Sequence, residues 1–412
     1  MQTQPSVPPE PIQKPGVTIS QKRPRSHVPL YICPTPGMMR ERTAEMPGSR
    51  RVLLTEQNNA AADDAAQVTQ LHADLLRWYA SARRDLPWRR TRDPWAIWVS
   101  EIMLQQTRVE TVRPYYERFL IRFPTPSALA EAAEDDVLAA WSGLGYYRRA
   151  RMLHAGARHV AGATMPDRRD ALLALPGIGR YTAGAIASIA YGEAVGLVDG
   201  NVARVLARIF AIPDDMRRVG MKVAERLAER IVAKEDPGAW NQALMELGAT
   251  ICTPRSPGCS TCPVNKDCRA YAEGRVNQLP VLSEKTKPIP QRLTAIVAVN
   301  GDRILLARRR PDGLFGGLWE PPLVEGGPKV VAELCTQLGV RSPVNKGKVV
   351  HVLSHRRLSI DVHLAHAPKA VVPSSLPEAY ESARFLARAE LESVGIATLG
   401  RKILATAGVL AS

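Results

Sequence analysis

The hydrophobic pattern of this 412-residue chain changes in kind at one polar, proline-bearing segment, residues 281–291 (VLSEKTKPIPQ). Before it, over 66–280, apolar side chains recur at helical spacing in runs such as VTQLHADLLRWYASAR and YTAGAIASIAYG, separated by Pro and Gly. After it, RLTAIVAV and RILLARRR flank an Asn-Gly turn, a strong β-hairpin signal. A single core rarely extends over so long a chain. We therefore predict an all-α domain over 66–280, a linker over 281–291 and a mixed α/β domain over 292–412.

The two ends of the chain carry weaker signals. Residues 1–65 are rich in Pro, Gln, Arg and Ala without a sustained apolar period, which predicts a disordered basic tail. Near the other end, KVVAELCTQLG predicts a helix, and KVVHVLS and LSIDVHLAHA predict strands. No apolar run approaches the roughly 20 residues that a membrane span requires, so we expect no membrane partner.

The formal net charge of +15 indicates a polyanionic partner, and nucleic acid is the commonest one. The alternative is a generally basic, solvated surface without a specific partner. Charge alone favours nucleic acid but does not identify it.

Four of the six cysteines fall within residues 252–268, at the spacing C-x6-C-x2-C-x5-C. Four thiolates in one short segment suit either zinc or an iron–sulfur cluster, and spacing alone does not choose between them. A single CxxC with two longer arms favours a cuboidal cluster over a two-knuckle zinc ribbon. This distribution is unlike a secreted disulfide scaffold and is typical of metal ligation in a reducing compartment. The candidate ligands are Cys252, Cys259, Cys262 and Cys268.

The stretch LPGIGRYTAG interrupts a helical region with two glycines, Gly177 and Gly179, just before a helix that begins near Arg180. Glycine permits positive φ and close backbone approach, and the start of a helix exposes free N–H groups. The pattern predicts a phosphate-binding turn. A plain helix–helix turn also favours Pro and Gly, so this alternative stays open.

Two carboxylates stand in unusual settings. Glu101 lies at helical spacing from Ile97, Trp98 and Leu104, on a mainly apolar stripe where burial would raise its pKa and suit it to general acid catalysis. It could instead bond a buried backbone group. Asp199 follows an apolar run and precedes Gly200-Asn201 and a helix. Its alternative role is that of a plain N-cap, without a part in catalysis.

The order of five motifs resembles the MutY family of adenine DNA glycosylases, in the helix-hairpin-helix superfamily. These motifs are WVSEIMLQQTRVETV, GLGYY, LPGIGRYTAG, VDGNVARVLAR and the cysteine segment. The resemblance is dense over 66–280 and looser in the C-terminal domain. It implies a six-helix barrel, a lobe carrying a [4Fe–4S] cluster on the four cysteines, and duplex DNA with adenine opposite 8-oxoguanine or guanine as substrate.

The resemblance also implies roles for individual residues. Protonated Glu101 would donate its proton to adenine N7, ionised Asp199 would stabilise the cationic sugar, and Tyr181 and Asn201 would orient the carboxylates and water. Family correspondence places three residues around the adenine: Arg89, Leu104 and Gln242. It places four beside 8-oxoguanine: Gln106, Thr107, Leu144 and Tyr146. Tyr146 would be a wedge into the base stack, and a buried core aromatic is the alternative for it.

The C-terminal domain resembles the Nudix-like domain with which this family recognises 8-oxoguanine, on the strength of GLFGGLWEPP and HVLSHRRL. A working Nudix hydrolase carries a glutamate-rich, Mg²⁺-binding helix. The corresponding helix here has one glutamate, Glu333, so we predict no pyrophosphatase activity. Ser354 and His355 match the family's Phe-Ser-His loop, but Leu353 replaces the Phe, which leaves the strength of 8-oxoguanine discrimination open.

Two other functions fit part of this pattern. A bifunctional endonuclease III-like glycosylase/lyase needs an amine for a Schiff base, and its lysine would stand where Tyr181 stands here. A catalytically silent iron–sulfur DNA-binding protein would not need Glu101, Asp199 and Asn201 together. We expect a monomer that is cytoplasmic and nucleoid-associated in a bacterium, or nuclear or mitochondrial in a eukaryote; the sequence does not indicate protein partners.

Overall fold

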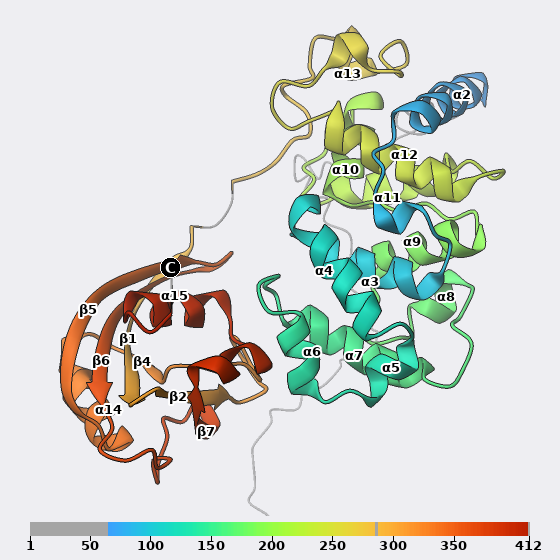
Figure 1. The fold of residues 1–412 in the computed structure, drawn as a ribbon. Helices are drawn as coiled ribbons and strands as arrows, with labels where there is room; N and C mark the ends of the chain where they lie inside the picture. Colours follow the sequence, from blue (N-terminus) through green and yellow to red (C-terminus); the bar gives the residue numbers. More distant parts are fainter. Residues whose placement is uncertain (1–64, 285–286, 411–412) are drawn as a thin grey trace, which may run out of the picture. The chain divides into compact units, whose positions relative to one another are not determined.

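The computed structural model describes residues 65–284 and 287–410, so the disordered tail predicted for 1–65 lies almost wholly outside the described residues. Residues 65–284 are helical and residues 289–410 form a mixed α/β domain, as the change of pattern predicts (Figure 1). The first strand already begins at Ile289, inside the segment predicted as a linker. Among the described residues no helix is long and apolar enough to cross a membrane.

The helical domain is a series of short helices with two 3₁₀ turns, Pro87–Arg89 and Cys259–Thr261. In chain order the α-helices are α2 (Ala65–Ala82), α3 (Pro94–Leu104), α4 (Val109–Arg122), α5 (Pro126–Glu131), α6 (Glu134–Ala140), α7 (Arg148–Val160), α8 (Arg169–Leu172), α9 (Arg180–Tyr191), α10 (Gly200–Ile209), α11 (Gly220–Arg230), α12 (Pro237–Thr250) and α13 (Arg269–Ala272).

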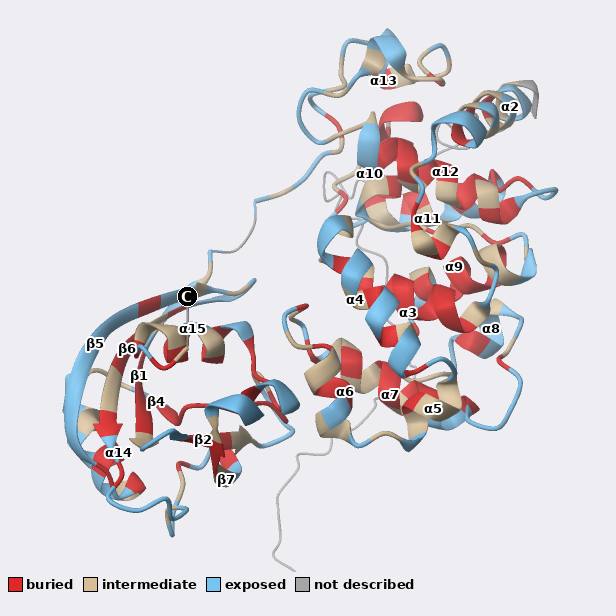
Figure 2. Cartoon of the chain, viewed as in Figure 1, coloured by how far each residue is buried: buried red, intermediate tan, exposed pale blue. Residues whose placement is uncertain are grey.

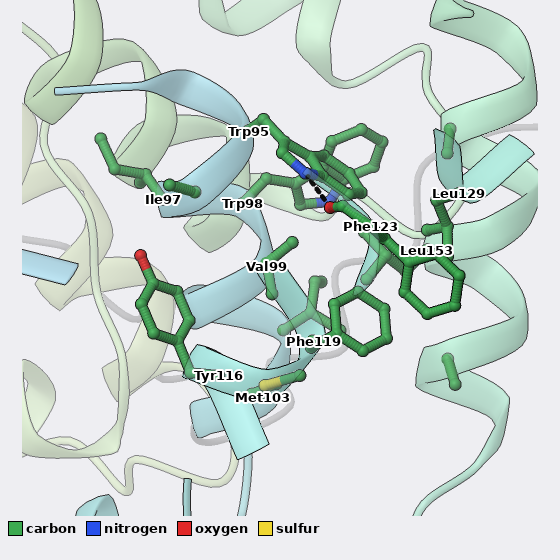
Figure 3. Packing of buried hydrophobic residues seen from close by; sticks show 14 of the residues in the cluster. Trp95, Ile97, Trp98, Val99, Met103, Tyr116, Phe119, Phe123, Leu129 and Leu153 are labelled. Carbon is green, nitrogen blue, oxygen red and sulfur yellow. Dashed lines mark hydrogen bonds between the residues drawn. The ribbon is translucent and has the colours of Figure 1, made fainter. Parts of the chain in front are cut away.

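Helix α3 is the buried centre of the first helical core, and Figure 2 shows it as an almost continuous buried segment. The Asp93 carboxylate accepts hydrogen bonds from the first free N–H groups, and Pro94 occupies the first helical position, so the helix start is fixed locally. Every residue from Trp95 to Met103 is buried. In Figure 3, Trp95 donates its indole N–H to the Phe123 carbonyl at 3.0 Å, which ties α3 to the end of α4.

A second helical core joins α2 to α10, α11 and α12. Its buried side chains include Leu71 and Leu75 of α2 and Trp240 of α12, whereas the intervening segment from Leu86 to Val195 supplies most of the first core. The chain therefore starts in one lobe, leaves it and returns.

The α/β domain contains one seven-stranded sheet with the path β3-β2-β1-β6-β5, to which β4 is added on β1 and β7 on β2. Strands β1 and β6 are parallel, and the other pairs are antiparallel. The elements are β1 (Ile289–Asn300), β2 (Arg303–Arg309), β3 (Trp319–Glu320), β4 (Leu323–Glu325), α14 (Val331–Leu338), β5 (Arg341–Val352), β6 (Arg356–His366), β7 (Tyr380–Ala387) and α15 (Thr398–Thr406), with 3₁₀ turns at Pro328–Val330 and Arg388–Ser393.

The predicted hairpin joins β1 to β2 through Gly301 and Asp302, with Asn300 paired to Arg303. Gly301 adopts φ of 60°, the left-handed conformation that a two-residue hairpin turn needs. Each face of the sheet has its own core, one with α15 and the other with α14. The helix predicted in KVVAELCTQLG and the strands predicted in KVVHVLS and LSIDVHLAHA are therefore confirmed as α14, β5 and β6.

Candidate active site

A pocket of about 490 Å³ opens in the helical domain where α3, α9, α10 and α12 meet. It brings together residues that are far apart in the sequence, which include both candidate carboxylates and all of the residues expected around adenine. The lining contains Arg89, Glu101, Leu104, Gln106, Thr107, Tyr181, Asp199, Asn201, Gln242 and Glu246.

Glu101 is the buried carboxylate of this pocket, with 6% of its surface exposed. Its Oε2 atom has no hydrogen-bond partner among the described residues. Burial raises the pKa of Glu101 to about 7; the Tyr181 hydroxyl opposes this rise and the nearby Asp199 adds to it. At neutral pH a substantial fraction of this side chain therefore carries a proton that it can donate.

Asp199 occupies the N-cap of α10, so the capping interpretation is confirmed, but the same side chain also lines the pocket. Its Oδ1 accepts from the Val202 amide at 2.7 Å, and its Oδ2 accepts from Asn201 Nδ2 at 3.2 Å. Burial raises the pKa of Asp199, and these hydrogen bonds from Val202 and Asn201 oppose the rise. The two carboxyls therefore differ in environment: one is apolar, and the other is supported by hydrogen bonds.

Asn201 is held in place from both sides. Its Oδ1 accepts from Arg204 Nη2 at 2.9 Å, and Arg204 also donates to the Gly248 and Cys252 carbonyls. A Cβ atom on Gly248 would lie 2.8 Å from the Asn201 Cβ, so glycine is required there for the two helices to approach.

Tyr181 stands in the first turn of α9 and faces the same pocket. Its hydroxyl donates to Met245 Sδ at 3.1 Å. Burial, with Glu101 and Asp199 close by, raises the pKa of Tyr181 well above its usual value, so the phenol stays protonated. Among the described residues that line the pocket there is no lysine.

An ion-pair cluster forms the opposite wall. Glu246 of α12 is fully buried, and its carboxylate accepts from Arg84 Nη2 at 2.8 Å and Arg89 Nη2 at 2.7 Å. Burial alone would raise the pKa of Glu246, but the two arginines outweigh it and hold the pKa at about 2. On the same helix, Gln242 accepts from the Tyr79 hydroxyl at 3.2 Å. Glu246 thus fixes the Arg89 guanidinium at the pocket.

Of the two glycines in the turn before α9, only Gly177 adopts positive φ, and phosphate binding at this turn stays a prediction. Gly177 adopts φ of 80°, and a Cβ there would lie 2.7 Å from the Met152 Cβ, so only glycine fits. Gly179 is the N-cap of α9 and has open space around it. The free amides at the start of this twelve-residue helix are therefore accessible.

The residues expected beside 8-oxoguanine lie on two loops. Gln106 is exposed on the loop after α3, and Thr107 follows it, half-buried. Tyr146 is 53% exposed on the loop before α7, so it is not a core aromatic. The Leu144 side chain is 5% exposed and packs into the first core, and its place beside 8-oxoguanine stays a prediction.

Comparisons with known proteins agree with this geometry. The adenine DNA glycosylase of Mus musculus is 37% identical over 409 aligned residues, covering 82% of this chain and 78% of the mouse protein. The chain belongs to the adenine DNA glycosylase family. The family member of Schizosaccharomyces pombe is 33% identical and is covered to 89% of its length.

The domain comparisons fall on either side of the predicted linker. The profile described as HhH-GPD superfamily base excision DNA repair protein matches residues 99–233, and a NUDIX domain profile matches residues 294–406. Among solved structures, a thermostable thymine-DNA glycosylase is 31% identical with a TM-score of 0.47, covering 50% of this chain and 98% of that one. The resemblance and the two-domain fold class inferred from the sequence are confirmed.

The four cysteines of the motif line one cavity beside α10, and no disulfide joins them. Arg208 Nη1 lies 3.3 Å from Cys252 Sγ and also donates to the Thr253 carbonyl at 2.8 Å. Four sulfurs with an adjacent cation are a donor set that fits an iron–sulfur cluster. In the described part of the chain, no three His, Cys, Asp or Glu side chains converge closely enough to hold a single metal ion.

The loop expected to read 8-oxoguanine connects β5 to β6. Leu353 is half-buried and packs against the core of the α/β domain, and its amide donates to the Arg356 carbonyl at 2.8 Å. Ser354 and His355 are exposed at the turn. Helix α14 corresponds to the Mg²⁺-binding helix of Nudix hydrolases and carries Glu333 as its one acidic residue. That the domain has no pyrophosphatase activity stays a prediction.

Sequence reasoning missed Glu246 and Arg84 at this site. The signal was available: in NQALMELG, Glu246 follows Gln242 by four residues and so shares its helix face. Its arginine partners, however, are more than 150 residues away in the sequence, and no local sequence pattern predicts an ion pair between such distant residues.

Proposed function

We propose that this chain removes adenine mispaired with 8-oxoguanine or guanine from duplex DNA, by acid-assisted hydrolysis of the N-glycosidic bond. The observation that carries the proposal is the pairing of two unlike carboxyls in one pocket. Glu101 is buried with a pKa of about 7, and Asp199 is anchored by Val202 and Asn201.

The reaction begins when adenine leaves the base stack and enters the pocket, because its glycosidic bond cannot be reached inside the duplex. Glu101 donates its proton to adenine N7, which neutralises the leaving base as the bond between the sugar and N9 breaks. Asp199 stabilises the positive charge that develops on the sugar. Water then adds to the sugar and gives a proton to the Glu101 carboxylate, which leaves free adenine, an abasic site and the acid restored.

The walls of the pocket support adenine as the base. Arg89, Leu104 and Gln242 line the pocket. The guanidinium and the amide would hydrogen-bond the base, and Leu104 would supply apolar contact. Glu246 keeps the Arg89 guanidinium in place through its 2.7 Å ion pair. Gln242 is oriented by hydrogen bonds with Tyr79 and the Gly238 carbonyl.

DNA contacts follow from the surfaces beside the pocket. The turn at Gly177 and Gly179 and the start of α9 would bind a backbone phosphate through N–H groups. The exposed Tyr146 ring would enter the stack beside 8-oxoguanine, with Gln106 and Thr107 next to it. Ser354 and His355 of the second domain would contact the 8-oxoguanine base, and Leu353 would support that loop from beneath.

A [4Fe–4S] cluster would be held by Cys252, Cys259, Cys262 and Cys268. When bound, it would supply a rigid cross-link for a loop that has little core of its own. The Arg204 side chain donates to the Cys252 carbonyl and to Asn201, so the position of this loop and the position of the catalytic amide depend on one residue.

We expect hydrolysis without strand cleavage. Lyase chemistry needs an amine that forms an imine with the sugar, and the phenol of Tyr181 cannot form one. The lysine-free pocket lining supports the same conclusion.

A single-turnover assay on three duplexes tests the proposed function. With enzyme in excess, adenine opposite 8-oxoguanine is expected to be released fastest, adenine opposite guanine more slowly, and adenine opposite thymine not measurably. The product strand stays intact until it is treated with base or heat, and borohydride traps no covalent complex.

Two results would contradict this account. Release from the adenine–thymine pair at a comparable rate would remove the mispair specificity. Strand nicking without base or heat, together with a borohydride-trapped complex, would assign the chain to the lyase branch.

A further inference from the structure

We propose that Arg149 is a positioning residue that joins the two DNA-facing loops of the helical domain into one reading unit. The first loop is residues 105–107, after α3, and the second is residues 143–146, before α7. The inference rests on the proposed function, since it assigns these loops to the strand that carries the base opposite adenine.

Arg149 reaches the first loop with one terminal nitrogen. Its Nη1 donates to the Ile102 carbonyl at 2.7 Å and the Met103 carbonyl at 3.1 Å, and it also contacts the Gln105 carbonyl. These carbonyls end α3, where helical hydrogen bonding leaves acceptors without partners. A cation at this end is also favoured by the helix dipole.

The other terminal nitrogen reaches both loops. Arg149 Nη2 donates to the Thr107 hydroxyl at 3.2 Å, to the Leu144 carbonyl at 3.3 Å and to the Gly145 carbonyl at 3.2 Å. One guanidinium thus satisfies acceptors on two chain segments about 40 residues apart, as its planar fork of donors permits.

This guanidinium is partly buried without a carboxylate partner among the described residues. Burial lowers the pKa of Arg149 to about 10, which still leaves it charged at neutral pH. A desolvated charge is stable only where enough acceptors surround it. Six oxygens accept from its two terminal nitrogens, two at the end of α3 and four on the two loops, whereas Nε has no partner among the described residues. The charge and the loop geometry therefore depend on each other.

Both loops hold a non-glycine residue in the left-handed region. Gln106 has φ of 57° and Tyr146 has φ of 49°, conformations that persist only where the surroundings impose them. The Arg149 guanidinium also lies 5.3 Å from the centre of the Tyr146 ring, which places the ring by cation–π attraction. Gln106 and Tyr146 are the two exposed side chains of this unit. The guanidinium of Arg149 holds oxygens on both sides of Gln106, those of Gln105 and Thr107. On the second loop it holds the two carbonyls that directly precede Tyr146.

Lysine cannot replace this function. An Arg149→Lys variant keeps the positive charge, but its single ammonium nitrogen cannot span acceptors on two segments as the forked guanidinium does. Charge and bridging can therefore be separated by one substitution.

The test measures mispair preference as a ratio of dissociation constants. In a Glu101→Gln background, which prevents turnover, Kd is measured for a fully paired duplex and for the same duplex with adenine opposite 8-oxoguanine. Arg149→Lys and Arg149→Met are each expected to lower the ratio of the two constants by about tenfold. The control, Arg148→Met, removes an exposed charge from the adjacent position on α7 and is expected to weaken both duplexes equally.

Both constants are measured on one protein preparation, so a reduced folded fraction cancels in their ratio, and Arg149→Lys keeps the test available if Arg149→Met does not fold. A ratio unchanged within about twofold in Arg149→Lys, with a lowered melting temperature, would show a purely structural role and overturn the proposal. Absence of any preference in the Glu101→Gln parent would instead count against the proposed function itself.

Discussion

Replacement of Glu101 by glutamine is expected to slow the single-turnover release of adenine by about 10²- to 10⁴-fold, while binding to the mispair persists. Glutamine keeps the shape of the side chain, but its amide cannot donate a proton with the acidity of a carboxylic acid. Because the wild-type side chain is buried with its pKa raised from 4.5 to about 7, the same substitution is expected to stabilise the fold above neutral pH.

The sign of this stability effect follows from proton binding. Below the unfolded pKa the carboxyl is protonated in both states and contributes no difference, whereas above the folded pKa the native state holds a desolvated charge. The free energy of unfolding of Glu101→Gln should therefore exceed that of wild type by about 3 kcal/mol at alkaline pH, and the gap should close as pH falls. Denaturant titrations at several pH values measure it.

The matched control is Glu117→Gln, an exposed glutamate on α4. It is expected to leave both the rate and the stability unchanged. Full adenine release by Glu101→Gln would refute the assigned acid, and equal stability of wild type and Glu101→Gln across the pH range would refute its buried, perturbed state.

Replacement of Cys262 by alanine is expected to abolish the visible absorption of the cluster and to lower the free energy of unfolding by about 3 kcal/mol or more. Between Cys252 and Cys268 the only buried side chain is Val264, so this loop has almost no apolar core to hold it. In the proposed cluster, ligation by the four thiolates would supply most of the order of this loop. Adenine release should fall as well, because Arg204 links the Cys252 carbonyl to Asn201.

Cys335 offers the control, since it is a buried thiol in the core of the α/β domain, remote in sequence from the motif. Cys335→Ala is expected to lower stability by about 1 kcal/mol through a small cavity and to leave the visible absorption unchanged. Absorption retained in Cys262→Ala would remove Cys262 from the ligand set.

Much of the fold could be read from local signals. The hairpin at Gly301, the helix start at Pro94 and the N-cap at Asp199 each depend on a few neighbouring residues, and each is found in the structure. The change from helical to strand periodicity likewise placed the second domain close to its observed start. Glu101 was identifiable because a carboxylate on an apolar stripe must either be hydrogen-bonded to a buried group or take part in catalysis.

Other features could not be read in this way, since they depend on contacts between distant segments. Glu246 pairs with two arginines from a distant segment of the chain, and Arg149 donates to oxygens of two loops. Leu144 sits in a loop that sequence places near DNA, yet its side chain turns into the core while Tyr146 turns outward. Tyr146 adopts a left-handed φ of 49°, which the sequence does not indicate for a tyrosine.

The most direct test of the central claim is the pH dependence of single-turnover adenine release from a duplex with adenine opposite 8-oxoguanine. If protonated Glu101 is the acid, the rate constant is highest below its pKa of about 7 and falls as pH rises through that value, approaching a tenfold loss per pH unit. A rate constant that stays level or rises between about pH 6 and about pH 9 would contradict the account.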